Sequence, residues 1–163
     1  MKKILVFAVV TLFSISVFAQ SVFDYNGIYY KLTSSTTVSV IANPDGTKYS
    51  GDITIPYTVK LGTIDFTDFT VTSIADSAFY FCTELTSIDL PTSISVIGKM
   101  SFCGCALLKS IKLPNITNVP YDAFCYCDKL ESVDISNVTT IDEGAFYRCS
   151  SLKSISDLSN VKE

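Results

Sequence analysis

The sequence predicts a solenoid of short stacked coils, and two observations carry that prediction. The first is a phenylalanine that recurs between Val71 and Leu158 at intervals of 23, 22 and 22 residues: Phe79, Phe102, Phe124 and Phe146. The second is the register around this anchor, because the same residue types return at the same distances from it in every copy. A period in the low twenties is too short for a pair of helices. It fits coils that each bury the apolar side chains of their neighbours.

Residues 1–19 have the features of an export signal. Two lysines precede an apolar run from Ile4 to Phe18, and Val17 and Ala19 occupy the positions that place cleavage before Gln20. The run is too short to cross a bilayer comfortably, and no cysteine lies near the cleavage point to carry a lipid anchor. The sequence therefore favours an exported chain, secreted or on the cell surface, without membrane insertion after signal removal. A retained membrane anchor is the less favoured alternative.

Residues 20–59 are expected to form an antiparallel β N-terminal cap and a partial first coil. Apolar and polar residues alternate from Ile28 to Thr33, which is the period of a half-buried strand. The segment from Asn43 to Gly46 is a turn signal between the second and third of three short strands. Solenoids need such a cap, because the first coil would otherwise expose its apolar face. Residues 60–70 are expected to be an insertion before the first complete coil.

Residues 71–163 are expected to form four coils of 22 or 23 residues. Three residues after each anchor stands a cysteine, and six after it a leucine: Cys82, Cys105, Cys127 and Cys149, and Leu85, Leu108, Leu130 and Leu152. A serine and an aliphatic residue follow: Ser87, Ser110, Ser132 and Ser154, and Ile88, Ile111, Val133 and Ile155. This alternation predicts a short parallel strand per coil, with the serine outward. The segment around the anchor does not alternate, and we expect one turn of helix or a tight arc there.

These residues resemble a known family. The string V-T-S-I-A-D-S-A-F-Y-F-C-T-E-L-T-S-I-D-L-P-T-S-I, from Val71 to Ile94, is similar to the BspA-like leucine-rich repeats of bacterial surface proteins of the Bacteroidetes type. The resemblance extends backward, because Gly51 to Val59 looks like the strand half of an earlier coil. Ser136 and Ser159 depart from the family's proline, which Pro91 and Pro114 keep. The resemblance implies a leucine-rich repeat solenoid that is secreted or displayed on the surface and serves in adhesion.

The six cysteines allow more than one interpretation. Four of them occupy one position in every coil, where a small buried side chain would form a structural ladder. A zinc site formed by Cys103 and Cys105 with Cys125 and Cys127 is less favoured, because two of these sulfurs would have to leave the core. Cys103 and Cys125 stand where the other coils have tyrosine, so we expect them nearer the surface. They lie one coil apart, about 4.8 Å, which is close enough for a disulfide between them, so this pairing stays an alternative.

Composition argues against chemistry and against nucleic acid. The chain has no histidine, so it lacks the usual general base and the commonest metal ligand. The recurring serines have no base beside them. Loss of the signal, with its two lysines and no acid, would lower the net charge from −4 to −6, and no basic run remains. We expect a non-enzymatic protein without catalytic residues, cofactor or metal.

Two classes of function fit the sequence. The first is a protein-binding or adhesion module that engages a host or bacterial macromolecule through its sheet face. The outward columns of that face are the candidate binding residues: Ser87, Asp89, Ser110, Lys112, Ser132, Asp134, Ser154 and Ser156. The tyrosines of the arc offer an alternative surface. The second class is a structural repeat protein that serves surface assembly without a specific ligand. The last coil lacks an evident cap, so edge-to-edge self-association or fraying is also expected.

Overall fold

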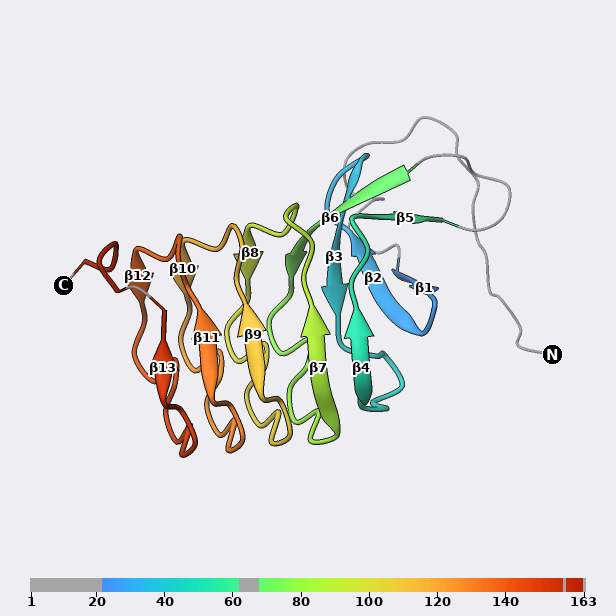
Figure 1. The fold of residues 1–163 in the computed structure, drawn as a ribbon. Helices are drawn as coiled ribbons and strands as arrows, with labels where there is room; N and C mark the ends of the chain where they lie inside the picture. Colours follow the sequence, from blue (N-terminus) through green and yellow to red (C-terminus); the bar gives the residue numbers. More distant parts are fainter. Residues whose placement is uncertain (1–21, 62–67, 157, 163) are drawn as a thin grey trace.

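The computed structural model describes residues 22–61, 68–156 and 158–162, so the expected export signal at 1–19 lies outside the described residues. Figure 1 shows a stack of coils that runs from a group of strands at the N-terminal end to the last coil at the C-terminal end. None of the described segments is helical, and so none forms a helix long enough to cross a membrane. Around each anchor phenylalanine the chain forms the tight arc, not the turn of helix that the sequence left open.

The first row of strands carries the alternation that the sequence predicts. It consists of β4 (Gly51–Thr54), β7 (Leu85–Asp89), β9 (Ser110–Lys112), β11 (Ser132–Asp134) and β13 (Ser154–Ile155), side by side in Figure 1. Strand β4 pairs with β7, and β9, β11 and β13 form a second ladder, all parallel. Inward Ile88, Ile111 and Val133 are buried. Equivalent positions therefore meet across the coils and leave the serines in a column on the outside.

A second row of strands lies on another side of the coils. It consists of β6 (Asp68–Ile74), β8 (Val96–Ile97), β10 (Asn118–Val119) and β12 (Thr140–Ile141). Strand β6 pairs with β8, and β10 pairs with β12, again in parallel. These strands hold the aliphatic residue that stands five positions before each anchor. The sequence did not predict β8, β10 and β12, because two residues are too few to show an alternation.

The N-terminal strands form a mixed sheet that continues the second row. Strands β1 (Val22–Tyr25), β2 (Ile28–Leu32) and β3 (Thr37–Ile41) pair antiparallel in that order. We expected an antiparallel N-terminal sheet. Strand β3, however, pairs in parallel with β6, so the sheet is mixed. The reason is that β3 takes the place of a preceding coil beside β6. Strand β5 (Thr58–Lys60) pairs antiparallel with β6, so both ends of the expected insertion are strand, while its residues 62–67 lie outside the described ranges.

The arcs depend on two left-handed residues in each coil, two positions before and two after the anchor. Their φ angles lie between 52° and 78°: Ser77, Phe81, Met100, Gly104, Asp122, Tyr126, Gly144 and Arg148. A left-handed residue other than glycine costs roughly 1–2 kcal/mol. Backbone hydrogen bonds between coils offset this cost, because the anchor N–H donates to the next coil, from Phe79 to Ser101 and from Phe102 to Ala123, both at 2.8 Å. The arcs therefore form only when coils stack.

The anchor phenylalanines form one column through the core, as predicted. The ring centroids of Phe79 and Phe102 are 5.1 Å apart, those of Phe102 and Phe124 5.2 Å, and those of Phe124 and Phe146 5.5 Å. The planes differ by only 2° to 6°. The first three rings are fully buried, whereas Phe146 is half-buried in the last coil. At the other end, Tyr49 packs against Phe79 with centroids 5.2 Å apart and joins the N-terminal segment to the column.

The repeated cysteines form a thiol ladder beside this column. The thiol of Cys105 donates to the Phe79 carbonyl of the preceding coil at 3.2 Å, and that of Cys127 donates to the Phe102 carbonyl at 3.1 Å. Cys149 repeats the contact on Phe124 at 3.0 Å. Burial raises the pKa of the Cys105 thiol, which keeps it in the form that can donate. A small apolar side chain with a weak donor is what this position requires.

Residues 158–162 continue along the stack, and Val161 packs against the core. The Asn160 side chain donates to the Ser136 carbonyl at 2.9 Å, and the Lys162 N–H donates to the Thr139 carbonyl at the same distance. Asn115 makes the equivalent side-chain bond to the carbonyl of Thr92 in an earlier coil. The tail therefore follows the path of a further coil for a few residues.

Candidate functional site

The candidate binding residues lie on the outside of the first row, which we call the serine face. Strands β9, β11 and β13 place Ser110, Ser132 and Ser154 opposite one another in register. No hydrogen bond of these three hydroxyls to another described residue is present, so each can donate and accept. Six of the eight predicted residues line one open hollow of about 430 Å³: Ser110, Lys112, Ser132, Asp134, Ser154 and Ser156.

Asp134 is the centre of the polar contacts in this hollow. Its Oδ1 accepts hydrogen bonds from the hydroxyls of Ser136 at 2.5 Å and Ser156 at 3.1 Å. Its Oδ2 lies 3.9 Å from Nζ of Lys112, on the neighbouring strand. The bond from Ser136 is the main reason that the pKa of Asp134 is lowered. The carboxylate is therefore charged and fixed at neutral pH, next to a cation that remains largely exposed.

Ser87 and Asp89 do not join this hollow. The Ser87 hydroxyl donates to Asp52 at 2.6 Å, and the Thr86 hydroxyl donates to the same carboxylate oxygen at 2.7 Å. These bonds, that of Ser87 first, lower the pKa of Asp52. Asp89 is exposed at the end of β7. Thr86 and Ser87 of β7 therefore form a separate polar contact with Asp52 of β4.

Two residues of the serine face were missed from the sequence. Asp52 lies opposite Ser87 in the β4–β7 pair, and extending the serine column one coil backward would have found it. Ser136 stands where Pro91 and Pro114 stand in the two preceding coils. The sequence shows Ser136 as a departure from the repeat, but the hydrogen bond from its hydroxyl to Asp134 is visible only in the structure.

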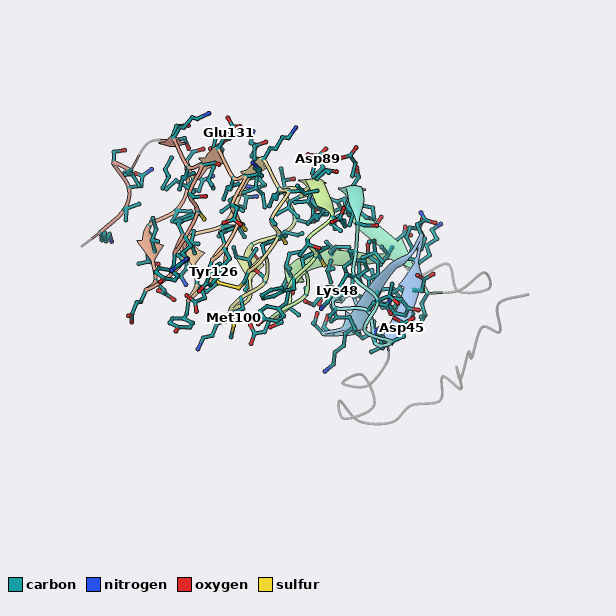
Figure 2. The ribbon with its side chains drawn as sticks, turned by 90° about the horizontal axis from the view of Figure 1, so that it is seen from below. Asp45, Lys48, Asp89, Met100, Tyr126 and Glu131 are labelled. Carbon is teal, nitrogen blue, oxygen red and sulfur yellow. A yellow bond between two sulfur atoms is a disulfide. The ribbon has the colours of Figure 1, made fainter. Side chains whose placement is uncertain are left out.

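The arcs lie on the opposite side of the molecule from the serine face. Figure 2 shows Asp89 and Glu131 on one side and Met100 and Tyr126 on the other. Large apolar side chains are exposed along the arcs: Tyr80, Phe81, Tyr121, Tyr126 and Tyr147. The tyrosines that the sequence named as an alternative surface are thus separated from the serines by the whole core.

Cys103 and Cys125 form a disulfide in the structure, with their Cα atoms 4.6 Å apart. The bond joins the arcs of two successive coils, 22 residues apart in the chain. Both residues are buried, at 5% and 3% exposure, so they lie only slightly nearer the surface than Cys105 and Cys127 at 0%.

The described residues do not assemble a catalytic or metal centre. Within them, no group of three or more histidine, cysteine, aspartate or glutamate side chains could hold a metal ion. The four sulfurs considered for zinc are divided between the disulfide and the thiol ladder. The serine face and the exposed tyrosines can bind a partner through hydrogen bonds, charges and aromatic rings.

Coils of two short parallel strands and one arc, closed around columns of buried phenylalanine and leucine, define a leucine-rich repeat solenoid. A family model described as BspA type leucine-rich repeat region matches residues 48–163 with 6 copies. The chain belongs to this family of BspA-type leucine-rich repeat proteins. The model thus includes the region before Val71 that resembles an earlier coil. Repeats of this family are typically found in surface proteins, and the family is generally non-enzymatic.

Solved structures agree on the fold. A leucine-rich repeat protein from Bacteroides capillosus has a TM-score of 0.70 and 22% identity, over 83% of this chain and 97% of that one. The pneumococcal vaccine antigen PcpA has a TM-score of 0.51 and 22% identity, over 87% of this chain and 39% of that one. A leucine-rich repeat protein from Eubacterium ventriosum also scores 0.51, at 19% identity, over 82% of this chain and 39% of that one. No curated protein matches the chain.

Proposed function

We propose that the chain is an exported, surface-associated binding module that attaches to another macromolecule, a protein on a host or bacterial surface, through the serine face. The observation that carries this proposal is the column of Ser110, Ser132 and Ser154, in register and without partners among the described residues, beside the Lys112–Asp134 pair. A repeated row of hydroxyls with one charge of each sign suits a polar partner. Family membership and the leader-like residues 1–19 support export to the surface.

The contacts of this face are exposed, so we expect modest, salt-sensitive affinity. Surface ion pairs and hydrogen bonds contribute little one by one, and salt screens them at separations near 10 Å. Lys112 and Asp134 have side chains that are 73% and 38% exposed. Binding would therefore depend on several coils acting together on one extended partner.

We also propose that β1, β2 and β3 act as the cap of the N-terminal end. Two observations support this role. Strand β3 pairs with the edge of β6, and the ring of Tyr49 packs against the ring of Phe79, which has no preceding phenylalanine of the column beside it. Both contacts shield groups that the first complete coil would otherwise leave open to water.

Capture experiments test the binding function. The chain is immobilised and exposed to host matrix proteins and to bacterial surfaces, and bound partners are identified. A variant with Lys112→Ala and Asp134→Ala should lose most binding to a captured partner, and salt should weaken the unmodified chain. The matched control is Lys99→Ala with Glu84→Ala, which removes one charge of each sign outside the hollow. Equal binding by both variants would contradict a role for the serine face.

A structural assembly role is the second candidate, because the arc N–H groups of Gly144, Phe146 and Arg148 have no backbone acceptor among the described residues. Light scattering at increasing concentration separates the two functions. Self-association without capture of any other macromolecule would support assembly, whereas a monomer that retains a specific partner would support adhesion.

A further inference from the structure

A second hollow lies on the arc side, between the third and fourth coils, and we call it the tyrosine hollow. Its volume is about 310 Å³, which is the size of one or two side chains. Three tyrosines and two carboxylates form its walls: Tyr121, Tyr126, Tyr147, Asp122 and Glu143. The serine face is on the other side of the core, so the two surfaces are separate sites (Figure 2).

The floor of the tyrosine hollow exists because the fourth coil has glycine where the other coils have a side chain. Gly144 is the left-handed residue two positions before its anchor, at φ 71°. The equivalent residues are Ser77, Met100 and Asp122. A Cβ at Gly144 would overlap the carboxylate of Asp122. The glycine thus allows that carboxylate to lie against the next arc and leaves the space above it open.

The aromatic rings of the hollow already attract a cation within the chain. Tyr126 and Tyr147 are perpendicular to each other, with centroids 5.7 Å apart. The guanidinium of Arg148 lies 5.7 Å from the centroid of each ring. The negative faces of aromatic rings bind cations in this way. Both tyrosines remain exposed, at 44% and 54%, so they offer further ring surface to a ligand.

The residues that line the hollow carry a net negative charge, and Arg148 lies beside them against the Tyr126 and Tyr147 rings. Asp122 and Glu143 contribute two carboxylates, and no lysine or arginine is among the lining residues. The charge of Asp122 raises the pKa of Tyr121, and the hydrogen bond between them adds to the effect, so this phenol stays neutral. A ligand for such a site needs one compact positive charge and an apolar stem that packs against tyrosine.

We propose that the tyrosine hollow binds the protonated side chain of a lysine on a partner protein. The ammonium group would lie between the carboxylates of Asp122 and Glu143, and the methylene stem would pack against Tyr126 and Tyr147. The negative charge of the chain favours a basic partner as well. The inference is independent of the serine face, because it rests on other residues on another side of the molecule.

Titration with a small lysine analogue tests this proposal. Nα-acetyl-lysine N-methylamide is added to the isotope-labelled chain, and backbone amide shifts are followed by NMR. Shifts should concentrate at Tyr126, Glu143 and Gly144, with saturation. Asp122→Asn with Glu143→Gln should weaken binding about tenfold or more, and Tyr147→Leu about threefold. The norleucine analogue, which has the same stem without the charge, should cause no saturable shift.

A matched variant separates a built site from general attraction to an acidic chain. Asp24→Asn with Glu84→Gln removes two exposed negative charges away from the hollow and should leave the dissociation constant within a factor of two. An equal loss in this variant, or equal binding of the norleucine analogue, would overturn the proposal, as would the absence of saturable binding. None of these results bears on the serine face, which is tested with Lys112 and Asp134.

Discussion

At the scale of single residues, the column of anchor phenylalanines holds the coils together. Each ring between two others is covered on both faces by a parallel neighbour, and the end rings have one such neighbour. Phe102 is fully buried, whereas Phe146 in the last coil is half-buried. The same residue type at the same repeat position therefore differs in energetic importance along the stack.

Replacement of Phe102 by alanine should be much more destabilising than the same change at Phe146. Removal of a fully buried phenylalanine costs about 3–5 kcal/mol, and the cost falls where the site is partly open to water. We expect the free energy of unfolding, measured by urea titration followed by circular dichroism, to decrease by that amount for Phe102→Ala and by less than half of it for Phe146→Ala. Equal losses would indicate that the last coil is covered in solution as the middle coils are.

At the scale of elements, the arc is a ladder in which alternate N–H groups bond to the next coil. The N–H groups of Gly104 and Tyr126 donate to Cys125 and Tyr147, at 2.7 and 2.8 Å. In the fourth coil, the N–H groups of Gly144, Phe146 and Arg148 have no backbone acceptor among the described residues. The arc of the last coil is therefore held from one side only.

Hydrogen exchange should reveal this difference between equivalent arc positions. The anchor amides of Phe79, Phe102 and Phe124 should exchange slowly, because each bonds to a buried carbonyl of the next coil. The Phe146 amide should exchange at least about a hundredfold faster at pH 7. NMR-detected exchange on the labelled chain measures all four. The intracoil amides of Tyr80 and Tyr147 are the matched control, because both keep an acceptor within their own coil. Comparable protection at Phe146 would contradict an open end.

The repeated elements could be predicted from the sequence because every coil has the same residue types at the same distances from its anchor phenylalanine. The Phe column, the serine column and the parallel first row all follow from residues at fixed distances from Phe102 and its equivalents. The left-handed conformations of Met100 and Tyr126 could not be predicted, because these residue types disfavour them and the bonds that offset the cost come from another coil. The pairing of β5 with β6 was missed because residues 60–70 have no equivalent in the other coils and were therefore expected to be an insertion.

For the candidate site, the sequence located the face but not its contacts. The outward direction of Ser110 and Ser132 follows from alternation alone. The bond from Ser136 to Asp134 depends on how the chain turns after β11, which no periodicity records. The tyrosine hollow depends on Gly144 lacking a side chain between two arcs. Such spaces arise from the stacking of particular coils and are not a property of the repeat.

At the scale of the whole molecule, Tyr49 connects the N-terminal strands to the solenoid. Its hydroxyl donates to the Ile41 carbonyl at 2.7 Å and accepts from the Tyr29 N–H at 3.1 Å, while its ring packs on Phe79. Burial raises the pKa of Tyr49 to about 12 from its ordinary value of 10.0. The folded state therefore holds this proton more tightly than the unfolded state does.

Alkaline solution should destabilise the molecule partly through Tyr49. Because the folded pKa is raised, the stabilisation is complete below about pH 10 and is lost as the pH rises toward 12. We expect the urea midpoint to fall across this window, and Tyr49→Phe, which cannot ionise, to show a shallower fall from a lower starting stability. Tyr57→Phe, at an exposed position, should reproduce the unmodified profile. A Tyr49→Phe profile as steep as that of the unmodified chain would assign the alkaline loss to other groups.

The direction of the arc hydrogen bonds gives the solenoid an electrical polarity across its coils. Every inter-coil N–H of the arc points toward the C-terminal end and every accepting carbonyl toward the N-terminal end. Within the arcs the amide dipoles therefore add along the stacking axis, with the positive end toward the last coil, whereas N–H groups outside the arcs, such as those of Glu131 and Asp142, donate to the preceding coil. Two copies that met last coil to last coil would place donors against donors. A twofold dimer can thus gain no arc hydrogen bonds at that end.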